Sequence, residues 1–239
     1  MHESRIGIQS TEALLRDGIL AKERKDFGTA AGFFTDTIIK SQEINYPHGV
    51  LHGLMNIGTI WKLKARETGS GDFARLARLS FLEAVDYAKT RNMPIEEVIH
   101  ATFLLGQAEG EVGNFPDAIS LYQESYDYYK EHPRSSAHTG DVQRHLGTAL
   151  VRAGNVDEGI SMMEKALSSI RTFDEANAFD KRNYVWETGA LLALSDAYGE
   201  TDQERATRLV QEALTIATER DLTIRKEEAE KMMRKLHTS

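Results

Sequence analysis

Two histidines one helical turn apart, His48 and His52, have a spacing that could serve metal chemistry. Side chains four residues apart share one face of a helix, so both imidazoles could reach a single ion. Pro47 marks the start of the helix that would carry them. No acidic residue nearby in the sequence completes a ligand set. We therefore interpret the spacing as chance and expect no metal site.

A second group of histidines, His132, His138 and His145, surrounds the segment HPRSSAHTG, which we interpret as a flexible connector. The phosphate-binding pattern GxxxxGK[ST], the zinc-protease pattern HExxH and the hydrolase pattern GxSxG are all absent. The sequence contains no cysteine, which excludes disulfides and thiolate metal sites. We expect neither enzymatic activity nor a cofactor.

The composition argues against several classes of partner. A net charge of −8 disfavours nonspecific binding to nucleic acid and to anionic membranes. No apolar run reaches the roughly 18 residues that a membrane span needs. The N-terminus lacks the basic and then apolar pattern of a secretory signal, so a cytoplasmic location is the default expectation.

The stretch Leu105–Tyr129 predicts a helix, a turn and a second helix. Gly106 lies inside the first helix, where a glycine costs roughly 1 kcal/mol against alanine unless close packing requires it. Gly113 and the asparagine after it predict the turn. In the second helix Ala118 is followed by a large residue and a small one, which together allow a close helix crossing.

This unit recurs four more times along the chain. The small first-helix residues are Gly18, Gly58, Gly106, Gly147 and Ser195. The small second-helix residues are Ala30, Ala77, Ala118, Gly159 and Ala206. The large residues that follow are Phe34, Phe81, Tyr122, Met163 and Val210, and the last small residues are Thr37, Ala84, Ser125, Ala166 and Ala213. Self-similarity of this kind is typical of a solenoid of stacked helix pairs.

These residues resemble the tetratricopeptide repeat (TPR) family from about Thr11 to Leu222. The repeats exceed the usual length of about 34 residues, like those of the long-repeat type in kinesin light chains and signalling adaptors. The resemblance implies an all-α fold: a right-handed α-α superhelix of five TPR-like helix pairs plus a C-terminal capping helix.

We expect residues 1–10 to form a flexible tail, with Thr11 as a helix N-cap, and residues 11–239 to form a single TPR-like solenoid domain. The expected repeats span about 11–45, 48–91, 95–131, 138–175 and 184–220, and the expected capping helix spans 223–237. Connections between repeats are expected near 45–47, 91–94, 132–139 and 176–182.

In TPR proteins, one stripe of each first helix lines a concave groove where peptides bind. By resemblance, the groove residues here are His52, Met55, Thr59, Lys62, His100, Phe103, Gln107, Arg144, Thr148 and Arg152. Met55 and Phe103 are expected to offer exposed apolar contacts.

The charges of the expected groove suggest the kind of partner. Lys62, Arg144 and Arg152 outnumber Glu111 and Asp141 on an otherwise acidic protein. A weakly basic groove favours a protein or peptide partner that bears a carboxylate.

The sequence thus favours a non-enzymatic scaffold that binds a peptide or partner helix in its groove. One alternative is a regulatory TPR protein that senses a ligand or peptide and changes superhelix shape on binding. Another is a helical phosphatase, for which no catalytic cluster is found. A partner could also bind the convex face or the helix expected over Thr223–His237.

Overall fold

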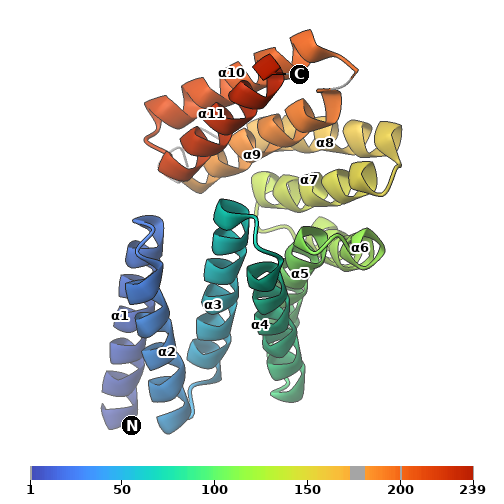
Figure 1. Cartoon of the computed structure of the whole chain (residues 1–239). Coiled ribbons are helices and arrows are strands. Elements are labelled where there is room, and N and C mark those ends of the chain that lie inside the picture. Colours follow the sequence, from blue (N-terminus) through green and yellow to red (C-terminus); the bar gives the residue numbers. More distant parts are fainter. Residues whose placement is uncertain (1, 173–180, 200, 239) are drawn as a thin grey trace. The chain divides into compact units, whose positions relative to one another are not determined.

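The computed structural model describes residues 2–172, 181–199 and 201–238, and all eleven elements within these ranges are α-helices (Figure 1). Unit 1, residues 1–114, contains α1 (His2–Glu23), α2 (Phe27–Glu43), α3 (Pro47–Thr68), α4 (Gly71–Thr90) and α5 (Ile95–Glu111). Unit 2, residues 115–239, contains α6 (Phe115–Glu131), α7 (Ser136–Arg152), α8 (Val156–Arg171), α9 (Lys181–Tyr198), α10 (Gln203–Glu219) and α11 (Thr223–Thr238).

The expected all-α class is confirmed, whereas the hand of the superhelix and the single continuous domain stay predictions. None of the described helices combines the length and apolarity that a membrane crossing requires.

In the first, second and fourth repeats, the small residue of the first helix packs against the large residue of the second. A side chain added at Gly18 would meet the ring of Phe34 at 2.5 Å, and one added at Gly58 would meet the ring of Phe81 at 2.7 Å. All twenty small and large residues of the predicted repeat pattern are buried, which confirms its register. The helices therefore approach closely because these positions lack bulk.

The crossing in the fourth repeat brings the backbones of its two helices close together. A Cβ at Gly147 would lie 2.7 Å from the backbone oxygen of Gly159 and 2.7 Å from Cγ of Met163. The expectation that Gly147 is buried against the second helix of its own repeat is confirmed. In the fifth repeat Ser195 takes the glycine's place, and its hydroxyl donates a hydrogen bond to the backbone oxygen of Ala206 at 3.0 Å.

The first helix begins earlier than expected, at His2, and so includes the segment predicted as a flexible tail. Thr11 lies inside α1 rather than at its N-cap, is buried, and donates its hydroxyl to the backbone oxygen of Gly7 at 3.0 Å. Gly7 faces the side chain of Ile44 at the end of α2, where an added Cβ would lie 3.2 Å away. This packing gives the start of α1 a tertiary partner that sequence propensity alone did not reveal.

Most helix ends fall at the predicted turns. Lys25, Asn45 and Asn92 adopt positive φ angles of 60°, 52° and 50° between helices. Asp26 caps α2 by accepting a hydrogen bond from the backbone N–H of Thr29 at 3.1 Å.

The connection expected over 132–139 is shorter than predicted, because α7 already begins at Ser136. Ser135 is its N-cap and accepts a hydrogen bond from the backbone N–H of His138 at 3.1 Å. Residues 173–180, which include most of the connection expected at 176–182 and the end of the repeat expected at 138–175, lie outside the described part. The expected capping helix is present as α11, whose Ala229 and Leu236 join the core formed with α9 and α10.

Candidate functional site

The ten expected groove residues lie on three helices of the two units. In unit 1, α3 and α5 carry His52, Met55, Thr59, Lys62, His100, Phe103 and Gln107. In unit 2, α7 carries Arg144, Thr148 and Arg152.

The expectation of exposed apolar groove contacts is wrong. Met55 is only 3% exposed and Phe103 only 7% exposed. Helices α3, α4 and α5 pack on one another within unit 1, and both side chains contribute to the buried core there. A partner that docks on this stripe would meet mainly polar side chains.

Polar pairs join α3 to α5 at regular intervals along the two helices. Lys62 Nζ donates a hydrogen bond to Gln107 Oε1, and both side chains are buried. One turn further on, Arg66 Nε pairs with Glu111 Oε1. Each pair joins residues 45 positions apart in the sequence. The two helices therefore lie in parallel with a fixed register.

At the other end of the same two helices, Glu97 of α5 lies between His48 and His52 of α3. Its Oε1 is 3.5 Å from His48 Nδ1 and 3.7 Å from His52 Nε2. The expectation that no acidic residue completes a set of ligands around these histidines is therefore wrong. The carboxylate comes from the next repeat, 45 residues after His52.

The electrostatics of this cluster favour a charged carboxylate. The interaction with His52 holds the pKa of Glu97 below its usual value, against a smaller opposing effect of burial, and the charges of His48 and His100 lower the pKa further. In the second group of histidines, the His138 ring lies edge-on to Tyr129 and the His132 ring stacks on Tyr128.

In unit 2 the basic residues of the stripe are paired with carboxylates. Arg144 donates from Nε and Nη2 to Asp141 Oδ1, at 3.0 and 2.7 Å, and the pair is buried. Arg152 pairs with Asp196 of α9, a carboxylate that the stripe in the sequence did not include. The expected excess of positive charge is thus offset in unit 2 by neighbouring acids.

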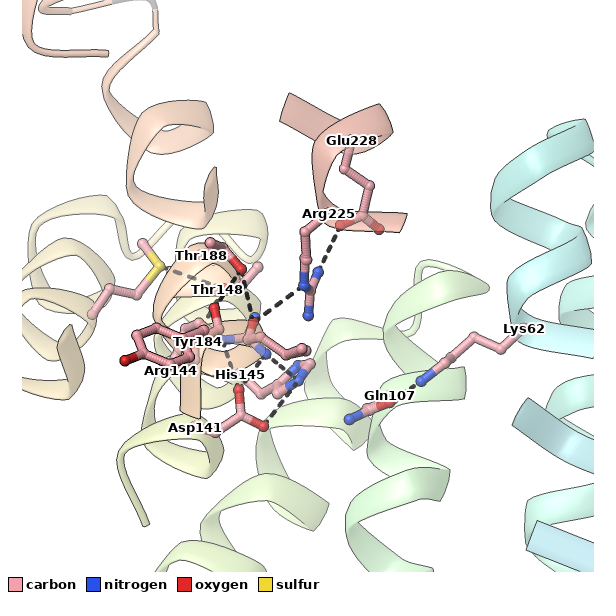
Figure 2. A network of polar contacts seen from close by, with 12 residues as sticks. Lys62, Gln107, Asp141, Arg144, His145, Thr148, Tyr184, Thr188, Arg225 and Glu228 are labelled. Carbon is pink, nitrogen blue, oxygen red and sulfur yellow. Dashed lines mark hydrogen bonds and ion pairs between the residues drawn. The ribbon is translucent and has the colours of Figure 1, made fainter. Parts of the chain in front are cut away.

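Two guanidinium groups of unit 2, those of Arg144 and Arg225, nevertheless both lie close to Gly189 of α9. Figure 2 shows the two arginines with their polar partners. A Cβ at Gly189 would lie 3.4 Å from Cζ of Arg225, on α11, and 3.7 Å from Cζ of Arg144, on α7. Arg225 Nε donates to the backbone oxygen of Val185 at 3.1 Å. Its Nη1 pairs with Glu228 Oε2 at 2.6 Å. Sequence reasoning missed this pair, because Arg225 belongs to the helix interpreted only as a cap.

Unit 2 also contains a hollow of about 510 Å³ between α8, α9 and α10. Glu164 occupies one side of it, accepting a hydrogen bond from the Tyr198 hydroxyl at 2.9 Å and pairing with Arg205. Arg205 lies over the Tyr198 ring, 4.2 Å from its centroid. The polar groups of Glu164, Tyr198 and Arg205 therefore satisfy one another.

No protein-family profile matches the sequence, and no curated protein gives a significant sequence match. Solved structures do match. BtubC (BKLC) from P. vanneervenii is 16% identical, with a TM-score of 0.62 over 92% of this chain and 90% of that one. A putative kinesin light chain from Podosopora anserina with TPR-like repeats is 14% identical, with a TM-score of 0.60 over 92% of this chain and 97% of that one.

A third similar structure is a Rap protein in complex with competence and sporulation factor, at 12% identity and a TM-score of 0.63. The match covers 97% of this chain and 64% of that protein. At these identities the likeness concerns the fold, and it agrees with the buried small and large residues of each described repeat. The chain therefore has the fold of a TPR-like helical repeat.

Proposed function

We propose that the protein is a non-enzymatic interaction scaffold that binds a carboxylate-bearing peptide or partner helix along the stripe of its first helices. The observation that carries this proposal is the pair of guanidinium groups, those of Arg144 and Arg225, that both lie within 4 Å of the position that a Cβ of Gly189 would take. Arginine presents a planar array of donors that matches a carboxylate, so two of them offer a specific contact.

The geometry leaves donors for such a ligand. The hydrogen bonds of Arg144 to Asp141 and His145 use Nε and Nη2, and those of Arg225 use Nε and Nη1. Arg225 Nη2 is the atom nearest to Gly189, 3.2 Å from the position that a Cβ would take. The Arg225 side chain is 20% exposed and that of Arg144 9%, so a carboxylate would reach Arg225 first.

Within each unit, exposed members of the stripe would add contacts to a partner bound there. In unit 1 these are the partly exposed His52, Thr59 and His100, and in unit 2 they are the partly exposed Thr148 and the exposed Arg152. The buried members Met55, Phe103, Lys62 and Gln107 would support these positions rather than contact the partner. The absence of catalytic motifs from the sequence favours binding over catalysis, and the net charge of −8 disfavours nucleic acid and anionic membranes as partners.

The test places a side chain at Gly189, next to both guanidinium groups. Gly189→Glu places a carboxylate of the protein itself there, whereas Gly189→Gln adds the same bulk without the charge. Peptides selected from a displayed library of short random sequences are measured by fluorescence polarisation, each as a free acid and as a C-terminal amide. We expect wild type to prefer the acid and to lose affinity as salt rises, and Gly189→Glu to lose at least about tenfold, or 1.4 kcal/mol.

A second pair of variants tests the rest of the stripe. Arg152→Glu should weaken the selected peptides, and Arg208→Glu, with a side chain 65% exposed against 55% for Arg152, should not. Circular dichroism verifies that every variant folds. Peptides that bind Gly189→Glu, Arg152→Glu and wild type equally would show that the partner docks elsewhere, on the convex face or on the part of α11 away from Arg225.

A further inference from the structure

The cluster of His48, His52 and Glu97 has the composition and spacing of a metal site. His48 and His52 lie in the first turns of α3 and point from one face of that helix, because they are four residues apart. Glu97 lies in the first turn of α5. One ligand atom from each residue lies within 4.8 Å of the other two.

The distances suit a tetrahedral ion better than direct hydrogen bonds. Zinc binds imidazole nitrogen and carboxylate oxygen at about 2.0–2.2 Å, which places two ligands of a tetrahedron about 3.4 Å apart. Glu97 Oε1 lies 3.5 Å from His48 Nδ1 and 3.7 Å from His52 Nε2. A good N–H···O hydrogen bond is shorter, at about 2.7–3.2 Å. The three side chains thus leave room for a cation between them.

The surroundings also suit a metal. The side chains of His48, His52 and Glu97 are 42%, 35% and 19% exposed, so an ion can enter from solvent. The Tyr46 ring lies against His48, with ring centroids 6.1 Å apart, and its hydroxyl donates to Glu12 Oε1 at 3.4 Å. All three ligands lie on helices that pack within unit 1, which limits the reorganisation that binding requires.

We propose that His48, His52 and Glu97 bind one Zn²⁺ ion that ties α3 to α5, leaving a fourth position for water or an external donor. Two imidazoles and one carboxylate form a set that zinc accepts, whereas Mg²⁺ and Ca²⁺ prefer ligand shells of oxygen atoms. The site links the first helices of two successive repeats. The site shares His52 with the proposed partner stripe, but the two proposals are tested separately, because zinc is measured on the protein alone.

The experiment uses the full chain without an affinity tag, freed of metal with EDTA and dialysed. Isothermal titration with ZnCl₂ should show one ion per chain, MgCl₂ should show no binding, and Co²⁺ should give the visible absorption of a tetrahedral site. Zinc should also raise the melting temperature, since a ligand of the folded state stabilises it.

Three single variants and one control assign the ligands. His48→Gln, His52→Gln and Glu97→Gln should each weaken zinc at least about tenfold, since even outer partners of metal ligands cost 10–100-fold. Glu97→Gln should also abolish the rise in melting temperature. The control His237→Gln removes an exposed histidine from α11 and should change neither result.

Two outcomes would overturn the inference. Wild type that neither binds zinc nor melts at a higher temperature with it would show that the cluster is only a proton-dependent set of polar contacts. Zinc bound equally well by the triple variant H48Q/H52Q/E97Q would place the ion elsewhere. Neither outcome bears on the peptide measurements, which are made in EDTA.

Discussion

At the scale of single residues, the fold depends on positions where a side chain is missing. Gly147 and Gly159 face one another across α7 and α8, and a Cβ on either would come within 2.7 Å of a backbone oxygen of the other helix. A backbone atom cannot move aside as a flexible side chain can. The separation of these two helices is therefore fixed by glycine rather than by the surrounding core.

We therefore predict that alanine lowers the unfolding free energy at one glycine and raises it at another. Gly147→Ala should destabilise the protein by about 1–3 kcal/mol, because the methyl group overpacks the crossing. Gly32→Ala should stabilise it by roughly 0.5–1 kcal/mol, because Gly32 lies in the middle of α2 with nothing within 4 Å of an added Cβ. Urea unfolding measures both. A Gly147→Ala variant as stable as wild type would contradict the tight crossing.

A second residue-scale prediction concerns the buried pair of Asp141 and Arg144. Removing one partner of a buried ion pair leaves the other without its countercharge, so Arg144→Ala should cost about 3–5 kcal/mol in unfolding free energy. Arg208→Ala breaks an exposed pair with Glu204 and should cost no more than about 0.5 kcal/mol.

Urea midpoints compare the two arginine variants, and the double variant Asp141→Ala/Arg144→Ala should recover part of the loss. Equal midpoints for Arg144→Ala and Arg208→Ala would mean that the buried pair adds nothing. Because Arg144 and Phe103 are buried, substituting either would lower stability. A loss of partner binding in such a variant could therefore not be assigned to a lost contact.

At the scale of helices, sequence periodicity predicts which face of each helix is apolar and where most helices end. Gly18, Gly58 and Gly147 could be placed at crossings from spacing alone, since one repeat's two helices must pack together. The early start of α1 could not be predicted, because its cause is the contact of Gly7 with Ile44, which depends on the tertiary structure.

The sequence also did not predict which neighbouring helix covers the stripe that carries Met55 and Phe103. Met55 and Phe103 were expected to be exposed, but they are buried. Periodicity shows that they share one face of their helices, but it does not show which neighbouring helix packs on that face. Sequence periodicity does not give the register between the first helices of successive repeats, that is, which residue of one lies opposite which residue of the next. A spacing of 48 residues joins Gly58 to Gly106 and would take His52 to His100, one turn from Glu97. Applying that spacing to the histidines could have found the carboxylate.

At the scale of the whole molecule, the division into units falls inside a repeat. Unit 1 ends at Asn114 and unit 2 begins at Phe115, so α5 and α6, the two helices of the third repeat, belong to different units. The repeat pattern itself continues across this point, with Gly106 before it and Ala118 after it, both buried. We therefore propose that the five repeats unfold as one cooperative solenoid, as coupling between nearest neighbours predicts.

The chain's two tryptophans allow this proposal to be tested, because each reports on one unit. Trp61 of α3 stacks on Phe73 in unit 1, with ring centroids 5.7 Å apart. Trp186 of α9 lies edge-on to His138 in unit 2, also at 5.7 Å. The variant W186F leaves fluorescence from Trp61 alone, and W61F leaves it from Trp186 alone.

In a cooperative solenoid both signals should change at the same urea concentration, since two-state unfolding gives coincident transitions for every probe. Adding Gly147→Ala, a substitution in unit 2, should then lower both midpoints by the same amount. The tryptophan variants without Gly147→Ala are the reference, because W61F and W186F can themselves shift stability. If the urea midpoint of Trp186 falls while that of Trp61 stays unchanged, the two units unfold independently. The five repeats would then not unfold as one cooperative solenoid.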